Sequence, residues 1–376
     1  MSKVKKVLIV GGGIGGLATA IALQKVGIET EIVEKQKKWN VYGVGIILQS
    51  NALRAIDALG ITEEFLAVGT THSALHIRDS QGNMIFDAPI HPSGQFNITG
   101  GIPRRDFHEI LLQAAIKNGT KIRMGITVEM IENADSFVYT KFTDGTSGTY
   151  DLVIGADGVR SKVRNMVFGD IEPTFVGQAV WRYTLKRPVD LENITMFYGQ
   201  KAKAGIVPMT KDSCYVFVVT AEPGNPWKQE EKLHVLMREA FQEFGGLIAE
   251  LSEQITDPKE VVYRPLETLI VEKPWYRDRV LLIGDSAHAT VPHLAQGAAM
   301  AIEDALVLSE LLQKDEPVLD ILNEFMERRY ERCKFVVDNS NTLVNWELLQ
   351  LEGRLPKENN PNAIVAQSLI RMTEVI

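Results

Sequence analysis

Residues 4–34, VKKVLIVGGGIGGLATAIALQKVGIETEIVE, decide how the chain around them folds. The apolar run VLIV is typical of a fully buried parallel strand. A G-x-G-x-x-G spacing begins at Gly11, and the helical pattern behind it ends at Gly27. A second strand pattern then ends in Glu34. The stretch therefore predicts a β-α-β unit with a glycine-rich turn at the start of its helix.

Each part of this turn has a physical role in binding the pyrophosphate of a dinucleotide. Gly11 permits the tight turn, Gly13 lets the backbone approach a pyrophosphate, and Gly16 lets the helix pack closely against the strand. Ile14 and Gly15 stand at the helix N-terminus, where free N–H groups and the positive end of the helix dipole favour phosphate. Because strand, glycines and helix occur together, a dinucleotide site is favoured over a plain glycine-rich loop.

Glu34 lies 18 positions after Gly16, at the end of the second strand. Its carboxylate can accept a hydrogen bond from a ribose 2′-OH and would repel a 2′-phosphate. Lys35, directly after it, is a second candidate contact. These residues leave open whether the dinucleotide is NAD or FAD.

Composition excludes several other classes of protein. The chain has 376 residues, enough for two or more packed lobes, and its 45% hydrophobic content is that of an ordinary globular protein. A net charge of −8 does not favour nucleic acid or anionic membranes, and no apolar run reaches the roughly 18 residues of a membrane span. Cys214 and Cys333 fit neither a disulfide framework nor a metal site, so we expect a cytoplasmic protein without a metal.

The order of patterns predicts an interrupted nucleotide-binding domain. Residues 73–86 look like a hairpin, and strands are expected over 121–131 and 137–142. Alternation and aromatic content rise over 174–221, as in an antiparallel sheet, and strand, glycine turn and helix recur after Arg279. We expect a discontinuous nucleotide-binding domain over 1–72, 100–173 and 275–330, a β-rich domain over 73–99 and 174–274, and a C-terminal helical region over 331–376, interrupted at Gly353, Pro356 and Pro361.

Two further strands end in glycine turns that carry an aspartate. Residues 152–158, LVIGADG, place Asp157 in such a turn, and residues 280–288, VLLIGDSAH, place Gly284 and Asp285 in another. Open α/β sheets bind ligands at the carboxyl ends of their strands. A carboxylate at position 285 suits hydrogen bonds to a polyol, with a helix N-cap as the alternative.

The segment after Asp285 is suited to a flat ring. Residues 291–300 read VPHLAQGAAM, and Gly297, Ala298 and Ala299 are small enough for backbone to lie against a ring. Their N–H groups point from the start of a helix, where a developing anion is stabilised.

These motifs together resemble the class A flavoprotein monooxygenases, a family of aromatic hydroxylases. The matching stretches are GGGIGG at 11–16 with Glu34, ADGVRSKVR at 156–164 and GDSAHATVPHLAQGAAMAIEDA at 284–305, in the family's order and spacing. The resemblance implies a Rossmann-like FAD-binding domain of the GR2 type with an inserted β-sheet substrate domain and C-terminal helices. It also implies resident FAD, NADH or NADPH as a transient electron donor, and O₂, which forms a flavin C4a-hydroperoxide that hydroxylates an activated ring.

The resemblance assigns roles position by position. The implied cofactor contacts are Gly11, Gly13, Ile14, Gly15, Gly16, Glu34, Lys35, Arg104, Val128, Asp157, Gly284, Asp285, Gly297, Ala298, Ala299 and Met300. Arg104 lies beside Arg105, which could take its place. Pro292 is expected near flavin C4a, and the backbone of Gly297 to Met300 near the flavin N1 and C2 carbonyl.

The expected substrate pocket departs from the family pattern in two places. Ser50 stands where the family often has proline, and the pocket segment around Ile47 carries no polar group. His293 is expected to face the pocket as an acid or base, with packing as the alternative. Tyr215 could relay a proton or be a core aromatic. Arg182 could pair with a substrate carboxylate or be a salt-bridged surface arginine.

The sequence thus predicts an FAD-dependent NAD(P)H:O₂ monooxygenase that hydroxylates a small aromatic or heteroaromatic compound with a carboxylate. Catalysis would involve His293, Tyr215 and Pro292, and substrate binding Ile47, Arg182, Tyr215 and His293. The alternatives are an epoxidase or prenyl reductase of the same fold, or a flavin-binding redox sensor. No nucleic acid or membrane partner is expected, and the chain could be a monomer or a homodimer.

Overall fold

The opening stretch folds as the sequence predicts. The computed structural model describes residues 4–41 and 43–376. β1 (Lys6–Val10) leads into the turn, α1 (Ile14–Lys25) follows, and β2 (Glu29–Glu34) returns parallel to β1. The four apolar residues of β1 are buried, as expected for an inner parallel strand.

β1 and β2 are inner strands of a six-stranded sheet with the order β18-β19-β12-β1-β2-β8. The other strands are β8 (Lys121–Met124), β12 (Leu152–Gly155), β18 (Tyr276–Arg277) and β19 (Val280–Leu282). All neighbours run parallel except β18 and β19. The helices α4 (Arg104–Lys117) and α9 (Gly297–Leu311) both pack against α1.

The strand expected over residues 121–131 is interrupted. Gly125, at a φ of +76°, turns the chain, so that β8 ends before β9 (Val128–Asn133) begins. β9 instead joins β10 (Val138–Phe142) and β11 (Ser147–Tyr150) in a three-stranded antiparallel sheet.

A second large sheet has seven strands in the order β17-β13-β16-β15-β14-β5-β6. They are β5 (Ala74–Asp79), β6 (Met84–Pro89), β13 (Thr174–Lys186), β14 (Ile194–Tyr198), β15 (Ala202–Pro208), β16 (Ser213–Ala221) and β17 (Val262–Thr268). β5 and β6 form the hairpin predicted over residues 73–86, and β5 pairs with the distant β14. The antiparallel sheet predicted over residues 174–221 is confirmed.

The two faces of this sheet have different partners because side chains alternate along a strand. On one face, Trp181 of β13 packs with Met237 of α6 (Leu233–Ala240) and Ile248 of α7 (Gly246–Ser252). On the other face, Val180 packs with Val344 of α10 (Val318–Leu351). Arg182, two positions from Val180, shares this second face.

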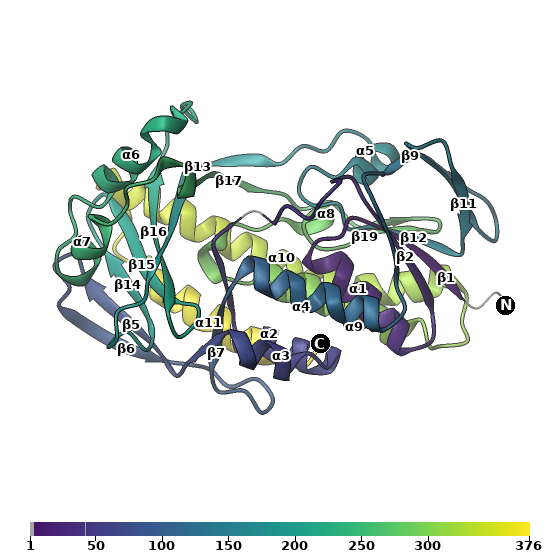
Figure 1. The fold of residues 1–376 in the computed structure, drawn as a ribbon, viewed down its shortest axis with the longest axis horizontal. Coiled ribbons are helices and arrows are strands. Elements are labelled where there is room, and N and C mark those ends of the chain that lie inside the picture. Colours follow the sequence, from purple (N-terminus) through teal and green to yellow (C-terminus); the bar gives the residue numbers. More distant parts are fainter. Residues whose placement is uncertain (1–3, 42) are drawn as a thin grey trace.

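The helix α10 connects the two sheets. Figure 1 shows the six-stranded and seven-stranded sheets at opposite ends of the long axis, with α10 between them. Its 34 residues span about 50 Å at 1.5 Å per residue. The remaining α-helices are α2 (Ser50–Leu59), α3 (Thr62–Val68), α5 (Lys162–Phe168), α8 (Asp285–His288) and α11 (Pro361–Thr373). Among the described residues, no helix is long and apolar enough to cross a membrane.

Several elements were not predicted from the sequence. One is a small sheet of β3 (Gly45–Leu48), β7 (Thr99–Pro103) and β4 (Thr70–His72), whose strands are short. The helix α11 lies within the predicted C-terminal helical region, and Pro361 begins this helix rather than interrupting it. Proline is tolerated in the first turn of a helix, and the Asn360 side chain caps this one by accepting from Ala363 N at 3.1 Å.

Buried ion pairs join α9 to α10. Asp304 Oδ1 accepts from Arg329 Nε at 2.8 Å, and Glu303 Oε2 accepts from Arg329 Nη1 and Arg332 Nε, each at 2.8 Å. His288 lies 2.7 Å from Asp304 Oδ2. Despite burial, these opposite charges hold the pKa of Asp304 and of Glu303 below their usual values and that of His288 well above its own. The cluster is therefore charged at neutral pH.

The same cluster positions the chain around the glycine turns. Asp304 Oδ2 also accepts from Gly284 N at 2.9 Å, and Glu303 Oε1 accepts from Asn51 Nδ2 at 3.2 Å. Asn51 and Gln296 exchange two side-chain hydrogen bonds, of 2.9 and 3.1 Å. Two adjacent acidic residues thus hold together α2, α10, the Gly284 turn and the segment before α9.

We predict that Arg329→Met destabilises the protein by about 3–5 kcal/mol, because it removes one partner of a buried ion pair and leaves carboxylates uncompensated. Urea unfolding followed by circular dichroism measures the change. The control is Arg328→Met, which removes a solvent-exposed pair with Glu310 and should cost under about 1 kcal/mol. Equal effects of the two substitutions would contradict the role given to the buried cluster.

Candidate active site

The glycine turn has the shape that a pyrophosphate site requires. Gly11 has a φ of +108°, and a Cβ there would lie 2.4 Å from Ala156 O. At Gly16 a Cβ would lie 2.0 Å from Gly11 O, so any side chain would push α1 away. A Cβ on Gly13, in contrast, meets nothing within 4 Å. Its backbone therefore borders open space at the start of α1.

Three distant motifs converge at this turn. The Ala156 carbonyl, beside Asp157, closes on Gly11 from the second motif. Ala301 of α9 packs against the other two motifs: a Cβ on Gly15 would be 3.3 Å from the Ala301 Cβ, and one on Gly284 would be 3.2 Å from it. The sequence-predicted glycine and aspartate turns thus lie at one edge of the six-stranded sheet.

A pocket of about 240 Å³ opens next to the turn. It is lined by Gly12, Gly13, Ile14, Glu34, Gln36, Trp39, Asn40, Val41, Arg104 and His108. Glu34 lies at the end of β2, as expected, and its carboxylate accepts from Gly12 N at 3.0 Å. Arg104 lines this pocket whereas Arg105 does not, which separates the two arginines that the sequence left interchangeable.

Trp39 and His108 belong to this pocket but were not predicted. Their ring centroids are 4.9 Å apart, and His108 Nε2 lies 2.8 Å from Gly12 O. Burial lowers the pKa of His108, so the neutral ring donates from Nε2 to that carbonyl. No local sequence signal pointed to them, except that an aromatic residue follows soon after Glu34.

Asp285 is available to a ligand. It is the first residue of α8, and the N-cap residue is Gly284, so the alternative of a helix N-cap is wrong. The residue is exposed to solvent, although many protein atoms surround its carboxylate. This desolvation raises the pKa of Asp285, while the charges of Arg104 and His288 lower it. In the described part of the chain, its carboxylate has no hydrogen-bond or ion-pair partner.

Asp157 is occupied within the protein. It accepts from Lys162 N at 2.7 Å, Val163 N at 3.1 Å and Ser161 Oγ at 2.5 Å, and so fixes the start of α5. Ser286 Oγ donates to it at 3.3 Å, which joins α5 to α8. A cofactor contact of Asp157 stays a prediction.

Other predicted cofactor contacts have varied surroundings. Val128 is buried, and its carbonyl accepts from Lys162 Nζ at 2.8 Å, while Lys35 is exposed beside the pocket. Ala299 and Met300 are buried in the first turn of α9, and Gly297 and Ala298 are half-buried. Their contacts with a cofactor stay predictions.

Arg182 carries a charge on the face of the seven-stranded sheet that packs against α10. It is half-buried, and burial lowers its pKa, as do the charges of Arg104 and Arg264, while Tyr215 opposes them. Over residues 4–41 and 43–376 it has no hydrogen bond and no ion pair. The alternative of a salt-bridged surface arginine is therefore wrong.

Tyr215 and Ile47 lie on the same side of that sheet. Tyr215 packs with Val207, Met209 and the half-buried Ile47, and a Cβ on Gly45 would be 2.7 Å from the Tyr215 ring. Burial raises the pKa of Tyr215 to about 12, so its hydroxyl stays protonated at neutral pH. The tyrosine thus is part of a core cluster, and a catalytic role stays a prediction.

His293 is held by an ionic group that the sequence did not reveal. Its side chain is 1% exposed, and Nε2 lies 3.0 Å from Glu347 Oε2. Glu347 Oε1 in turn pairs with Lys203 Nζ at 2.5 Å. These contacts hold the ring in place, and an acid–base role for His293 stays a prediction. Pro292, directly before it, is exposed.

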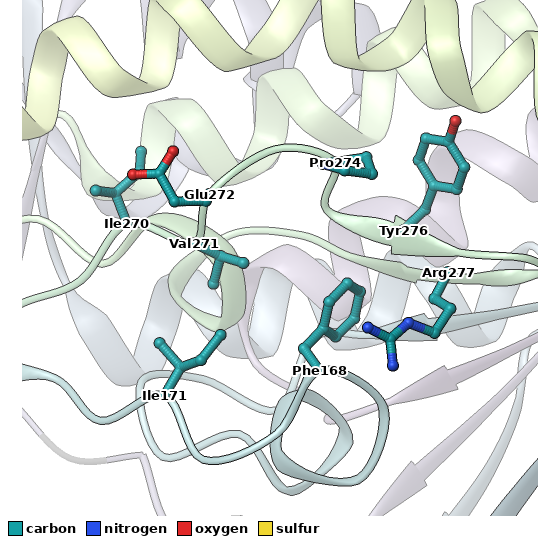
Figure 2. A pocket seen from close by; sticks show the side chains of 8 residues that line it. All are labelled: Phe168, Ile171, Ile270, Val271, Glu272, Pro274, Tyr276 and Arg277. Carbon is teal, nitrogen blue, oxygen red and sulfur yellow. The ribbon is translucent and has the colours of Figure 1, made fainter.

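A larger pocket of about 440 Å³ contains none of the predicted site residues. Figure 2 shows its lining, which combines apolar side chains such as Phe168 and Ile270 with Glu272 and Arg277. It lies beside β18, at the edge of the six-stranded sheet. We assign it no role in the candidate site.

The geometry at the glycine turn fits FAD: open backbone at Gly13, a pocket lined by the Glu34 carboxylate, and Asp285, which has no partner among the described residues, at the same sheet edge. A sequence model of the FAD binding domain family matches residues 5–340. The chain therefore belongs to this family, the class A flavoprotein aromatic hydroxylases, and is an FAD-dependent monooxygenase.

Individual relatives cover nearly the whole chain. The 2-heptyl-3-hydroxy-4(1H)-quinolone synthase of Pseudomonas aeruginosa PAO1 is 32% identical, over 97% of this chain and 94% of the relative. The 3-hydroxybenzoate 6-hydroxylase 1 of Aquipseudomonas alcaligenes is 30% identical, over 87% and 85%. The crystal structure of Klebsiella pneumoniae HpxO with FAD and uric acid has the same fold, with a TM-score of 0.86, 21% identity, and 98% and 96% of the two chains covered. These findings confirm the predicted α/β fold with a Rossmann-like FAD domain.

We predict that Gly13→Leu weakens FAD binding at least about tenfold, which corresponds to 1.4 kcal/mol. The Cβ of the new side chain meets no atom within 4 Å, so the side chain enters the open space beside the turn. Fluorescence titration of the apoprotein with FAD measures the affinity. The urea unfolding of the apoprotein serves as the control and should not change, and unaltered FAD affinity would contradict the assignment of this space.

Proposed function

We propose that the protein hydroxylates a small aromatic or heteroaromatic substrate that carries an anionic group, a carboxylate above all, with NADH or NADPH as electron donor. The observation that carries this proposal is Arg182. A guanidinium that has no partner among the described residues, and whose pKa is lowered by burial, is stabilised when a carboxylate binds it. The relative named for 3-hydroxybenzoate has a carboxylated ring in its name, whereas the name of the quinolone synthase contains no acid group.

Each proposed site residue has a distinct task. Arg182 binds the carboxylate and orients the ring, and the apolar Ile47 and Met209 exclude water from it. His293 accepts the proton of a ring hydroxyl, which makes the ring more nucleophilic. Bound FAD supplies the electron transfer and the activation of O₂.

Apolar contacts link the segments that carry Arg182 and His293, which supports a shared role for the two residues. Val180 of β13 packs with Val291, and each of these valines is two positions from one of the two residues. The N–H groups at the start of α9, over Gly297 to Met300, are placed to stabilise negative charge on the cofactor side. The division into an FAD-binding domain and a substrate domain, given above from the sequence, is part of this proposal, and oligomeric state stays a prediction.

The purified protein tests the proposal. We expect a yellow flavin spectrum and oxidation of NADH or NADPH that hydroxybenzoates and hydroxynicotinates stimulate, with equimolar O₂ uptake and a hydroxylated product. NAD(P)H oxidation with substrate but without O₂ uptake would indicate a reductase, an epoxide product would indicate an epoxidase, and no stimulated turnover would indicate a redox sensor.

We predict that Arg182→Met raises KM for a carboxylated substrate about 10- to 100-fold, because a charge-assisted hydrogen bond worth about 1.5–3 kcal/mol is lost. Steady-state kinetics measure it, with the matching phenol that lacks the carboxylate as the comparison substrate. The control variant is Arg238→Met, an exposed arginine of α6 on the opposite side of the sheet. Equal loss for both substrates would contradict the proposed pairing.

A further inference from the structure

The contacts of Glu347 determine the state of His293. Glu347 accepts from Lys203 Nζ at 2.5 Å and from Gln178 Nε2 at 3.0 Å, and His293 Nε2 lies 3.0 Å from it. Lys203 and His293 hold the pKa of Glu347 far below its usual value against the effect of burial, so this group is a carboxylate at neutral pH. A carboxylate only accepts hydrogen bonds. His293 must therefore carry a proton on Nε2.

Nδ1, the other ring nitrogen of His293, is buried and has no hydrogen-bond partner among the described residues. Burial and the charge of Lys203 lower the pKa of His293 more than Glu347 raises it, so the ring is neutral and Nδ1 holds a free electron pair. A buried acceptor without a donor costs about 1–3 kcal/mol, which a ligand that donates a proton would recover.

We propose that Glu347 is a positioning residue: it holds His293 in the tautomer with hydrogen on Nε2, so that Nδ1 accepts the substrate's hydroxyl proton. This rests on the proposed function, in which His293 is the base. The substrate O–H bond breaks, its electron pair stays on the ring oxygen, and the proton bonds to Nδ1. The resulting imidazolium keeps its Nε2–H bond to the Glu347 carboxylate, and the proton returns to the oxygen once the product has formed.

The arrangement joins three parts of the chain. His293 lies in the short turn after α8 (η3, Pro292–Leu294), Lys203 is the second residue of β15, and Glu347 lies near the end of α10. Lys203 and Glu347 are the charged groups that act on the His293 pKa, and Tyr198 of β14 also faces Glu347. The two charges act in opposite directions, which gives the proposal a signature that a purely structural role lacks.

Nuclear magnetic resonance of the FAD-loaded protein with ¹⁵N-labelled histidine tests the tautomer without any substrate. His293→Gln identifies the resonances of this ring. We expect hydrogen on Nε2 at pH 7, and Glu347→Leu should produce a mixture of tautomers. Hydrogen on Nδ1 in the unaltered protein, or no change of tautomer in Glu347→Leu, would overturn the proposal.

A pH titration of the same resonances separates the two charges. Lys203→Met should move the His293 titration to higher pH and Glu347→Gln to lower pH, since the neutral amide keeps an acceptor oxygen but not the charge. Lys201→Met, an exposed lysine two positions away, is the matched control and should change nothing. Shifts in the same direction, or none, would overturn the proposal.

Steady-state kinetics test whether Glu347 affects turnover through His293. A base must be neutral to act, so kcat/KM should fall as pH drops through the His293 pKa, and this acidic limb should move up in Lys203→Met and down in Glu347→Gln. Glu347→Leu should lower kcat at least about tenfold at pH 7. If no aromatic substrate is hydroxylated, the proposed function fails while the resonance data still decide the tautomer. If turnover occurs but the limb does not move, the role of Glu347 is refuted alone.

Discussion

The buried charges of Glu303 and Asp304 are the constraint on which the rest of the structure depends. Removing carboxylates and guanidinium groups from water is costly, and the cost is offset only when each is paired with good geometry. Here Arg329 donates to both acids and Arg332 donates to Glu303, each at 2.8 Å, and Asp304 also accepts from the Gly284 N–H. The start of α9 and the Asp285 turn can therefore take only one position relative to α10.

This constraint explains why separate motifs form one site. Gly11 lies against the Ala156 carbonyl, and Gly15 and Gly284 both pack against Ala301. Ala301 is two positions before Glu303. The turn of the first β-α-β unit and the turn before α8 are thus pressed together through small residues. The open side of this contact is where the proposed FAD site lies, at the carboxyl ends of β1 and β19.

Local patterns predicted many of the elements but not the contacts between them. The β-α-β unit, the hairpin of β5 and β6 and the antiparallel sheet follow from periodicity and turn residues, which act over a few positions. Glu303 and Asp304 belong to the third family motif, but the motif does not reveal their ion pairs, because the partner arginines are 25 and more residues away. The charged partners of His293 come from β15 and α10, so no motif could reveal them.

The same distinction applies within the candidate site. Glu34 and Gly13 were located by spacing, because their roles derive from one compact unit. The choice between Arg104 and Arg105 required the start of α4 to be placed beside the pocket, and the absence of a partner for Arg182 among the described residues required the whole sheet. Small strands such as β3 escaped prediction because they are stabilised by pairing with β7 rather than by their own sequence.

The helix α10 also imposes a rule on the length of the chain. Arg329 and Glu347 are 18 residues apart, and at 3.6 residues per turn this is about five full turns, so both side chains project from the same side of the helix roughly 27 Å apart. Inserting or deleting one residue between them would rotate Glu347 by about 100° about the axis while Arg329 stayed in its ion pairs. The number of residues in α10 thus sets both the distance and the relative orientation of the buried ion pairs beside the proposed FAD site and of the carboxylate that holds the proposed base.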